Sequence, residues 1–208
     1  MFDFFFLALA LLIIAVALFS RKTSSPTRAE RIGAAGEDRV HQAVARLGLP
    51  ILSDLYVPHA GGTSQIDHVV NLGGSIAVLE TKTYSGEIIA ADPHAPYWTV
   101  RYGNQEHRLD NPIAQNRGHI RALKARHPDV WMENIVVFAG DARWNAPMPA
   151  GVVDLDELAE ALVTRRKPLT AAVARAWKSL ASLEADNRKN KDTLKRAHVQ
   201  RIQRKRAA

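Results

Sequence analysis

The sequence predicts an α/β domain that carries an apolar segment at its amino terminus and a basic helical tail at its carboxyl terminus. Three observations favour this fold class: two helical patterns of apolar residues, several strand-like runs around them, and a positive charge concentrated near the end of the 208 residues. The chain contains no cysteine, which excludes disulfides, a thiolate nucleophile and cysteine-ligated zinc. It also lacks a GxxxxGKS/T loop, so it is not itself a nucleotide-driven motor.

The first twenty residues are expected to form a membrane anchor. Residues 4–19, FFFLALALLIIAVALF, contain no polar side chain, and as a helix they would reach ~24 Å, a little less than the hydrocarbon core of a bilayer. Arg21 and Lys22 follow, and the positive-inside rule places them in the cytoplasm. We therefore expect residues 1–20 to be a transmembrane helix of a single-pass protein in a bacterial inner membrane, with a cytoplasmic domain.

Two alternatives remain for this segment. A cleaved signal peptide would be preceded by basic residues, but the only charged residue there is Asp3. A buried core helix is the other alternative. A short polar linker at residues 21–29 is expected between this segment and the domain.

The first element of the domain, which we expect to span residues 30–165, is a helix from Ala29 to Leu47. Gly48-Leu49-Pro50 ends this helix, and residues 51–57, ILSDLYV, follow as a strand. Small or apolar residues at helical spacing give the helix one buried stripe: Ile32, Gly36, Val40, Val44 and Leu47.

A hairpin is predicted next. Gln65–Val70 and Ser75–Lys82 have the composition of strands, and Asn71-Leu72-Gly73-Gly74 between them is typical of a turn. With a four-residue connection, Asp67 pairs with Val78.

Polar side chains share one face of this hairpin, where the apolar run of its second strand ends. Because side chains alternate with period two, Asp67 lies on the same face as Glu80 and Lys82, whether the turn has two or four residues. Asp67 and Glu80 become diagonal neighbours, with Cα atoms roughly 7–8 Å apart. Two carboxylates this close repel unless they are solvated or share a cation, and a hard divalent ion suits oxygen ligands.

Two further residues complete this candidate site. An ammonium group at Lys82, one pleat beyond Glu80, can orient and polarise an attacking water or stabilise an oxyanion. Glu37 lies on the buried stripe of the first helix, so we expect its carboxylate to point toward the metal face. Gly33 and Gly36 beside it would let that helix approach the sheet closely.

The remaining elements continue the α/β pattern. A second helix begins at Asn111-Pro112, with Asn as the cap and Pro at the first helical position, and runs to about Arg126. Beyond Pro168 the chain is again helical and becomes basic. The other expected elements are strands at Glu87–Ala91, Tyr97–Tyr102, Asn134–Ala139 and Gly151–Asp154, and a helix at Asp154–Thr164.

Four motifs in order resemble the nuclease-related domain (NERD), a family within the PD-(D/E)XK superfamily of restriction-like nucleases. They are GAAGED (33–38), QIDHVV (65–70), AVLETKTYSG (77–86) and NPIAQN (111–116). The resemblance covers about residues 30–140. It implies a restriction-endonuclease-like αβββαβ core, with a mixed sheet flanked by helices, that cleaves nucleic-acid phosphodiesters with Mg²⁺ or Mn²⁺.

The resemblance also implies roles for individual residues. Asp67 and Glu80 would bind the metal, with the carbonyl of Thr81 as a further ligand. Lys82 would position the nucleophilic water. Glu37 would be an acid that reaches the metal directly or through water, and Gln115 would orient water or phosphate. The proline that often precedes the aspartate in this family is Ile66 here, and proline is not a ligand.

Each of these residues also has a plainer interpretation. Taken alone, Glu80 and Lys82 are typical of a charged strand end, and Asp67 of a solvated acid near a turn. The shared face, the acid on the first helix and the order of the motifs favour a site. His68 falls on the opposite hairpin face, where we expect a structural role. No metal-ligand spacing is seen at His59, His94, His107 and His119.

The tail at residues 166–208 holds most of the excess charge. From Arg188 onward there are nine lysines and arginines and one acid, Asp192, whereas the rest of the chain has 19 basic and 20 acidic residues. The tail is either a solvated helix or a segment that binds nucleic-acid phosphate or anionic lipid.

The sequence therefore predicts a membrane-anchored, metal-dependent nuclease whose partner is nucleic acid, with DNA the expected form. The alternative is a catalytically inactive NERD module that serves as a nucleic-acid-binding or adaptor protein at the membrane, because a fold does not fix a function. No feature of the sequence points to a protein partner.

Overall fold

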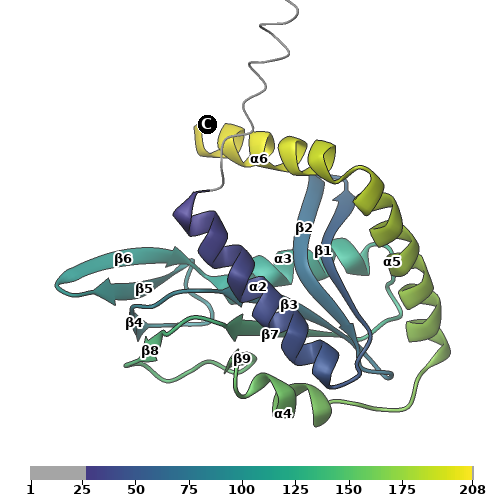
Figure 1. Ribbon diagram of the computed structural model, residues 1–208, viewed down its shortest axis with the longest axis horizontal. Coiled ribbons are helices and arrows are strands. Elements are labelled where there is room, and N and C mark those ends of the chain that lie inside the picture. The colour runs from purple at the N-terminus through teal and green to yellow at the C-terminus, as the bar shows by residue number, and fades with distance from the viewer. Residues whose placement is uncertain (1–26, 208) are drawn as a thin grey trace, which may run out of the picture. The chain divides into compact units, whose positions relative to one another are not determined.

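The computed structural model describes residues 27–207. The expected anchor at residues 1–20 and most of the linker lie outside the described residues. Among the residues that are described, no helix is long and apolar enough to cross a membrane. From Ile32 onward the described chain forms one compact unit, an α/β fold with two mixed sheets and flanking helices (Figure 1).

The larger sheet has five strands in the order β1-β2-β3-β7-β9. β1, β2 and β3 are antiparallel neighbours, whereas β7 runs parallel to β3 and to β9. The parallel pairing of β3 with β7 means that the two most buried strands end at the same edge of the sheet. The strands are β1 (Ile51–His59), β2 (Gly62–Asn71), β3 (Ile76–Lys82), β7 (Met132–Phe138) and β9 (Val152–Asp154).

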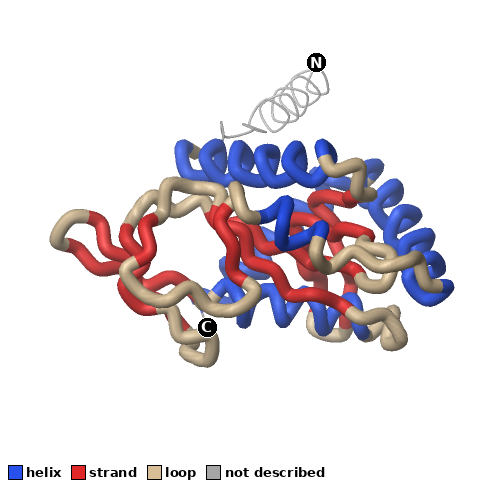
Figure 2. The backbone as a smooth tube through the Cα atoms, turned by 90° about the horizontal axis from the view of Figure 1, so that it is seen from below, coloured by secondary structure: helices blue, strands red, loops and turns tan. Residues whose placement is uncertain are grey.

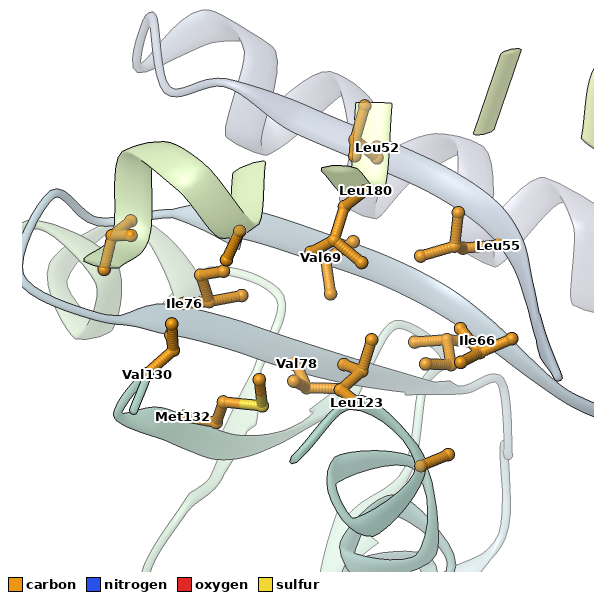
Figure 3. Close-up of a cluster of buried hydrophobic side chains, with 14 residues drawn as sticks. Leu52, Leu55, Ile66, Val69, Ile76, Val78, Leu123, Val130, Met132 and Leu180 are labelled. Atoms are coloured by element: carbon orange, nitrogen blue, oxygen red, sulfur yellow. The ribbon is translucent and has the colours of Figure 1, made fainter. Parts of the chain in front are cut away.

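Helices cover both faces of this sheet (Figure 2). On one face, α2 (Arg28–Arg46) and α4 (Leu158–Val163) enclose a core that includes Val40, Val70 and Leu79. The other face is covered by α3 (Pro112–Lys124) and α5 (Ala171–Lys189). Figure 3 shows the second core, in which Leu123 of α3 and Leu180 of α5 lie among side chains of the sheet.

The smaller sheet has four strands in the order β6-β5-β4-β8 and is an insertion. Three of its strands follow β3 and precede α3, so the order α2-β1-β2-β3-α3-β7 expected for the core is kept around it. Trp98 anchors the insertion, because its buried ring stacks on Phe138 with centroids 6.3 Å apart. The strands are β4 (Glu87–Ala90), β5 (Tyr97–Tyr102), β6 (Gln105–Asp110) and β8 (Arg143–Trp144).

The carboxyl-terminal helix α6 (Lys191–Ala207) runs past the ends of β1 and β2 (Figure 1). His198 Nδ1 lies 3.2 Å from the Thr63 carbonyl oxygen, and Arg201 donates to the same oxygen at 3.0 Å. One turn before α6, the side-chain oxygen of Asn187 accepts a buried hydrogen bond of 2.7 Å from the Tyr56 backbone N–H. The basic helical tail is thus attached to the sheet.

The hairpin register differs from the predicted one by two residues. Val78 pairs with Val69 instead of Asp67, and Asn71 is the last residue of β2, paired with Ile76. The prediction was wrong because it counted Asn71 as turn and Ser75 as strand, whereas the connection is Leu72–Ser75 and buries the Leu72 side chain. A shift of two residues leaves every side chain on its predicted face.

Other boundaries also differ. The helix expected at Asp154–Thr164 begins only at Leu158, since its first residues belong to β9 and a turn. The two-residue strand β8 was not expected from the sequence.

Candidate active site at the end of strand β3

Strand β3 changes from apolar to charged at its last three residues. Residues 76–79 are fully buried, and the Glu80 residue that follows is only 2% exposed. Thr81 and Lys82 are partly exposed at the end of the strand. A carboxylate this deep needs compensating partners, because an isolated buried charge is strongly disfavoured.

Lys82 supplies the first compensation. Its Nζ lies 2.6 Å from Glu80 Oε1 and donates a second hydrogen bond of 3.0 Å to Gln115 Oε1. Burial by itself would lower the pKa of the Lys82 ammonium, but the Glu80 carboxylate outweighs it and raises that pKa. The amine is therefore a fixed, charged group held between two elements of the fold.

Helix α3 brings Gln115 to this position. Asn111 caps the helix by accepting hydrogen bonds from the backbone N–H groups of Ile113 and Ala114. One turn later, buried Asn116 donates to the backbone carbonyls of Val78 and Ile135, in neighbouring strands β3 and β7. The sequence motif NPIAQN thus contains a cap, an anchor to the sheet and, between them, the residue that meets Lys82.

Asp67 lies on β2 beside the end of β3. The ladder between the two strands ends with the pair His68 and Leu79, so Asp67 and Glu80 are the first residues beyond it. The Thr81 backbone N–H donates to Asp67 Oδ2 at 2.8 Å. Burial, together with the negative charge of Glu80, raises the pKa of the Asp67 carboxyl well above its ordinary value. These two acids crowd each other, as expected of groups that could share a cation.

Glu80 has one oxygen that no hydrogen bond satisfies. Its Oε2 is buried, and His119 Nε2 lies 3.2 Å away in a geometry that does not form a hydrogen bond. Burial would raise the pKa of Glu80, but the Lys82 ammonium and His119 together lower it. An ionised carboxylate with a free oxygen, beside Asp67, fits a hard divalent cation. The described part of the chain contains no group of three His, Asp or Glu side chains arranged to hold a metal unaided.

Glu37 lies on the opposite side of the sheet from the α3 residues of the site, whereas it was expected to point toward the metal face. It lies on α2, which covers the face opposite α3, and among the described residues no hydrogen bond joins its carboxylate to Asp67, Glu80 or Lys82. Burial, followed by the negative charges of Asp54 and Glu80, raises the pKa of Glu37. The close approach expected for Gly36 is confirmed, because a Cβ atom there would collide with the Thr83 side chain, whereas Gly33 has open space.

The structure adds a fourth acid, Asp54, which the sequence did not single out. It occupies the position in β1 between the paired residues Ser53 and Leu55, and its φ of 55° is rare for a residue with a side chain. Lys191 Nζ of α6 lies 2.8 Å from Asp54 Oδ2. The unusual backbone turns this carboxylate toward α6, and the basic tail supplies its counter-charge.

His119 is the second residue that sequence reasoning missed. It was set aside for lack of metal-ligand spacing, yet it approaches Glu80. The sequence does contain a signal for His119: it follows Gln115 by four residues, and this spacing places both side chains on one face of the helix.

His68 lies on the hairpin face opposite Asp67, as expected, and this face is the one that α2 covers. Ser53 Oγ bridges it to His41, at 2.8 Å from His68 Nδ1 and 2.9 Å from His41 Nδ1. Burial, followed by the neighbouring His41, lowers the pKa of His68 to about 4. It is a neutral, structural residue behind the candidate site.

The fold and these strand-end residues define an α/β protein with a partly buried, charged site that combines carboxylates with a lysine. A family model for the nuclease-related domain matches residues 32–139. Because that match covers slightly more than half of the chain and includes every residue predicted for the site, the chain belongs to the nuclease-related domain family.

The chain is also similar to a protein of known sequence, but to no solved structure. The chain is 33% identical over 99 residues to an uncharacterized protein of Bacillus anthracis. The similar stretch covers 44% of this chain and 45% of that protein, so the chain spans less than half of its relative. No solved structure matches the chain.

Proposed function

We propose that this protein is a metal-dependent nuclease that hydrolyses phosphodiester bonds of nucleic acid with a metal-activated water. The observation that carries the proposal is the position of Lys82, whose ammonium is held between Glu80 and Gln115 at the strand end where Asp67 also lies. Membership of a nuclease-related family supports the same chemistry. The core order α2-β1-β2-β3-α3-β7 agrees with the αβββαβ order that the family resemblance implies, which supports the proposal.

Each residue has a distinct proposed role. Asp67, Glu80 and the Thr81 carbonyl would hold Mg²⁺ or Mn²⁺, which lowers the pKa of a bound water and stabilises charge on the phosphate. Lys82 donates a hydrogen bond to the attacking water or to a phosphate oxygen, and Gln115 keeps the Lys82 amine in place. Glu37 supplies a further acid, directly or through water. Because a metal binds the ionised carboxylate and the pKa of Asp67 is raised, metal affinity should fall as pH is lowered.

Calorimetry with Mn²⁺ tests the metal site. Asp67→Ala should abolish the binding that the wild type shows, while Glu106→Ala, which removes an exposed acid from the outer sheet, should not. Equal Mn²⁺ affinity in wild type and Asp67→Ala would contradict the proposal.

Cleavage assays test the reaction itself. The wild type should cleave plasmid or single-stranded substrates with Mg²⁺ or Mn²⁺, and Lys82→Ala should not.

A second candidate function is a binding or adaptor module without catalysis. It is favoured by the direct Lys82–Glu80 ion pair, which neutralises the carboxylate without any metal. In that case wild type and Lys82→Ala would bind nucleic acid equally and neither would cleave it.

We further propose that the protein is tethered to the inner face of a bacterial membrane. The support is the apolar run at residues 4–19 followed by Arg21 and Lys22. Protease added outside intact spheroplasts should leave the domain uncut, and digestion of residues 30–208 would show the opposite orientation.

A further inference from the structure

A groove of about 450 Å³ opens beside the candidate site, between α3, the turn that joins β1 to β2, and α6. It is continuous with the site, because Gln115 and His119 belong to both: one accepts a hydrogen bond from Lys82 and the other lies next to Glu80. The residues that line it include His59, Gln115, Gly118, His119, Arg121 and Arg201.

The charge of the groove is of one sign. Arg121 and Arg201 contribute two permanent positive charges, His59 and His119 add imidazoles, and no carboxylate is among the residues that line it. Arginine forms bidentate hydrogen bonds with phosphate oxygens, which makes phosphate the anion that this lining fits best. A groove of this size encloses a molecule as large as one nucleotide, whereas a double helix is far wider.

The position of Arg201 is fixed by the fold. Its guanidinium donates to the Thr63 carbonyl, and it crosses β2 over Gly62, where a Cβ atom would collide with the guanidinium. Gly62 also has a φ of 122°, a conformation that favours glycine. Arg201 lies beyond the segment that matches the nuclease-related domain, so this wall of the groove is an addition by this chain's own tail.

The opposite wall leaves the helix backbone accessible. Gly118 lies inside α3, where glycine costs about 1 kcal/mol relative to alanine, and a Cβ atom there would meet only the end of the Arg121 side chain. Packing therefore does not require this glycine. Its place in the lining is consistent with a ligand that approaches the helix closely.

We propose that this groove binds a single strand of nucleic acid, with Arg121 and Arg201 holding phosphates next to the one positioned at Lys82. The proposal rests on the proposed nuclease function and names its substrate as a single strand. It assigns α6 the role of a substrate-binding wall.

Binding without metal tests the groove independently of cleavage. The full-length chain is titrated in EDTA against a short labelled single-stranded DNA, and against the duplex of the same sequence, at several salt concentrations. The single strand should bind more tightly than the duplex. Arg121→Ala and Arg201→Ala should each weaken its binding about tenfold, as for loss of one charge-assisted hydrogen bond, and each should reduce the salt slope by about 0.7.

Two control variants separate phosphate binding from other effects. Arg204→Ala removes an equal charge from an exposed position on the same helix, outside the groove, and should weaken binding much less. His198→Ala removes the other contact of α6 with Thr63 but keeps Arg201, so a comparable loss there would mean that Arg201 only attaches the helix. Gly118→Leu, which fills the groove, should weaken binding while the thermal unfolding midpoint is kept.

The possible outcomes test the groove proposal and the nuclease proposal separately. Unchanged binding in Arg121→Ala and Arg201→Ala, an equal loss in Arg204→Ala or His198→Ala, or tighter binding of the duplex overturns the proposal. If the wild type cleaves and the groove variants bind and cleave like it, the groove proposal fails and the nuclease function stands. If the groove variants lose strand binding but the wild type never cleaves, the groove stands and the nuclease function fails.

Discussion

Two sets of ion pairs lie on strands of this protein, and they differ in how far water reaches them. At the end of β3, the Lys82 and Glu80 side chains are 16% and 3% exposed and their charged atoms are 2.6 Å apart. In the outer sheet, Arg101 pairs with Glu87 at 3.4 Å and with Glu106 at 3.1 Å, and these side chains are 39%, 29% and 54% exposed.

The difference in exposure indicates which of the two clusters is not explained by stability alone. An exposed pair contributes about 0–1 kcal/mol and costs little to keep. For a buried pair the desolvation penalty offsets much or all of the Coulombic attraction, so an apolar pair of similar volume often serves stability as well. The buried Lys82–Glu80 pair is therefore consistent with the proposed catalytic role, whereas the outer cluster needs no function to explain it.

The largest expected effect is on activity. Lys82→Met keeps the length of the side chain and removes the ammonium, and it should lower the rate of Mn²⁺-dependent cleavage at least about 100-fold, because one positioned donor or acid–base group contributes that much. Arg101→Met is the matched change in the outer sheet and should leave the rate within about twofold. A wild-type cleavage rate in Lys82→Met would mean that the buried cluster contributes no more to activity than the exposed one.

Stability should respond in a non-additive way. Lys82→Met alone should lower the free energy of unfolding by about 3 kcal/mol, because it leaves the Glu80 carboxylate buried without its main partner. Adding Glu80→Gln should recover most of that loss while cleavage stays absent. Urea denaturation of the two single variants and the double variant measures the coupling, and strictly additive losses would contradict it.

His68, a buried group that is hydrogen-bonded to Ser53, extends the comparison to the pH dependence of stability. Its pKa is about 4 in the folded protein and 6.5 as the ordinary value, so between these values the unfolded chain binds more protons and stability falls as pH falls. From pH 7.5 to pH 5 this group should cost about 2 kcal/mol of unfolding free energy. His68→Asn keeps an acceptor near Ser53 and should show a correspondingly smaller decrease in urea denaturation at the two pH values.

The smallest effect is expected for the exposed cluster. Arg101→Ala should change the unfolding free energy by less than about 1 kcal/mol at low ionic strength. In 1 M salt the difference should shrink further, since exposed charges are screened. A larger change, or one that is independent of salt, would mean that the outer cluster is energetically closer to the buried one than its exposure suggests.

Much of the fold could be predicted from the sequence because its signals are local. The buried Gly36, Val40 and Val44 of α2, the cap at Asn111 and the apolar runs of β3 and β7 each depend on residues close in the chain. Ile32, which was expected on the same buried stripe, is 45% exposed. The register of the hairpin could not be predicted in the same way, because the burial of Leu72 in the connection depends on tertiary packing. The face that carries Asp67 survived this error only because the shift was an even number of residues.

In the candidate site, too, the residues that are close in the sequence could be grouped in advance and the distant ones could not. Asp67, Glu80 and Lys82 could be grouped from strand periodicity alone. Lys191 could not be placed beside Asp54, because the pair joins a strand to a helix far along the chain and involves a backbone conformation that aspartate rarely adopts. Contacts between distant elements leave no periodic pattern to read.

The hydrogen bond between Tyr56 and Asn187 joins residues 131 positions apart, and this has a consequence for synthesis. Domains begin to fold while the chain is still emerging from the ribosome, amino-terminal parts first. The strands and helices that hold Asp67, Glu80, Lys82 and Gln115 are complete well before α5 and α6 emerge. A nascent chain should therefore pass through a stage in which the acids are assembled but the groove still lacks its Arg201 wall.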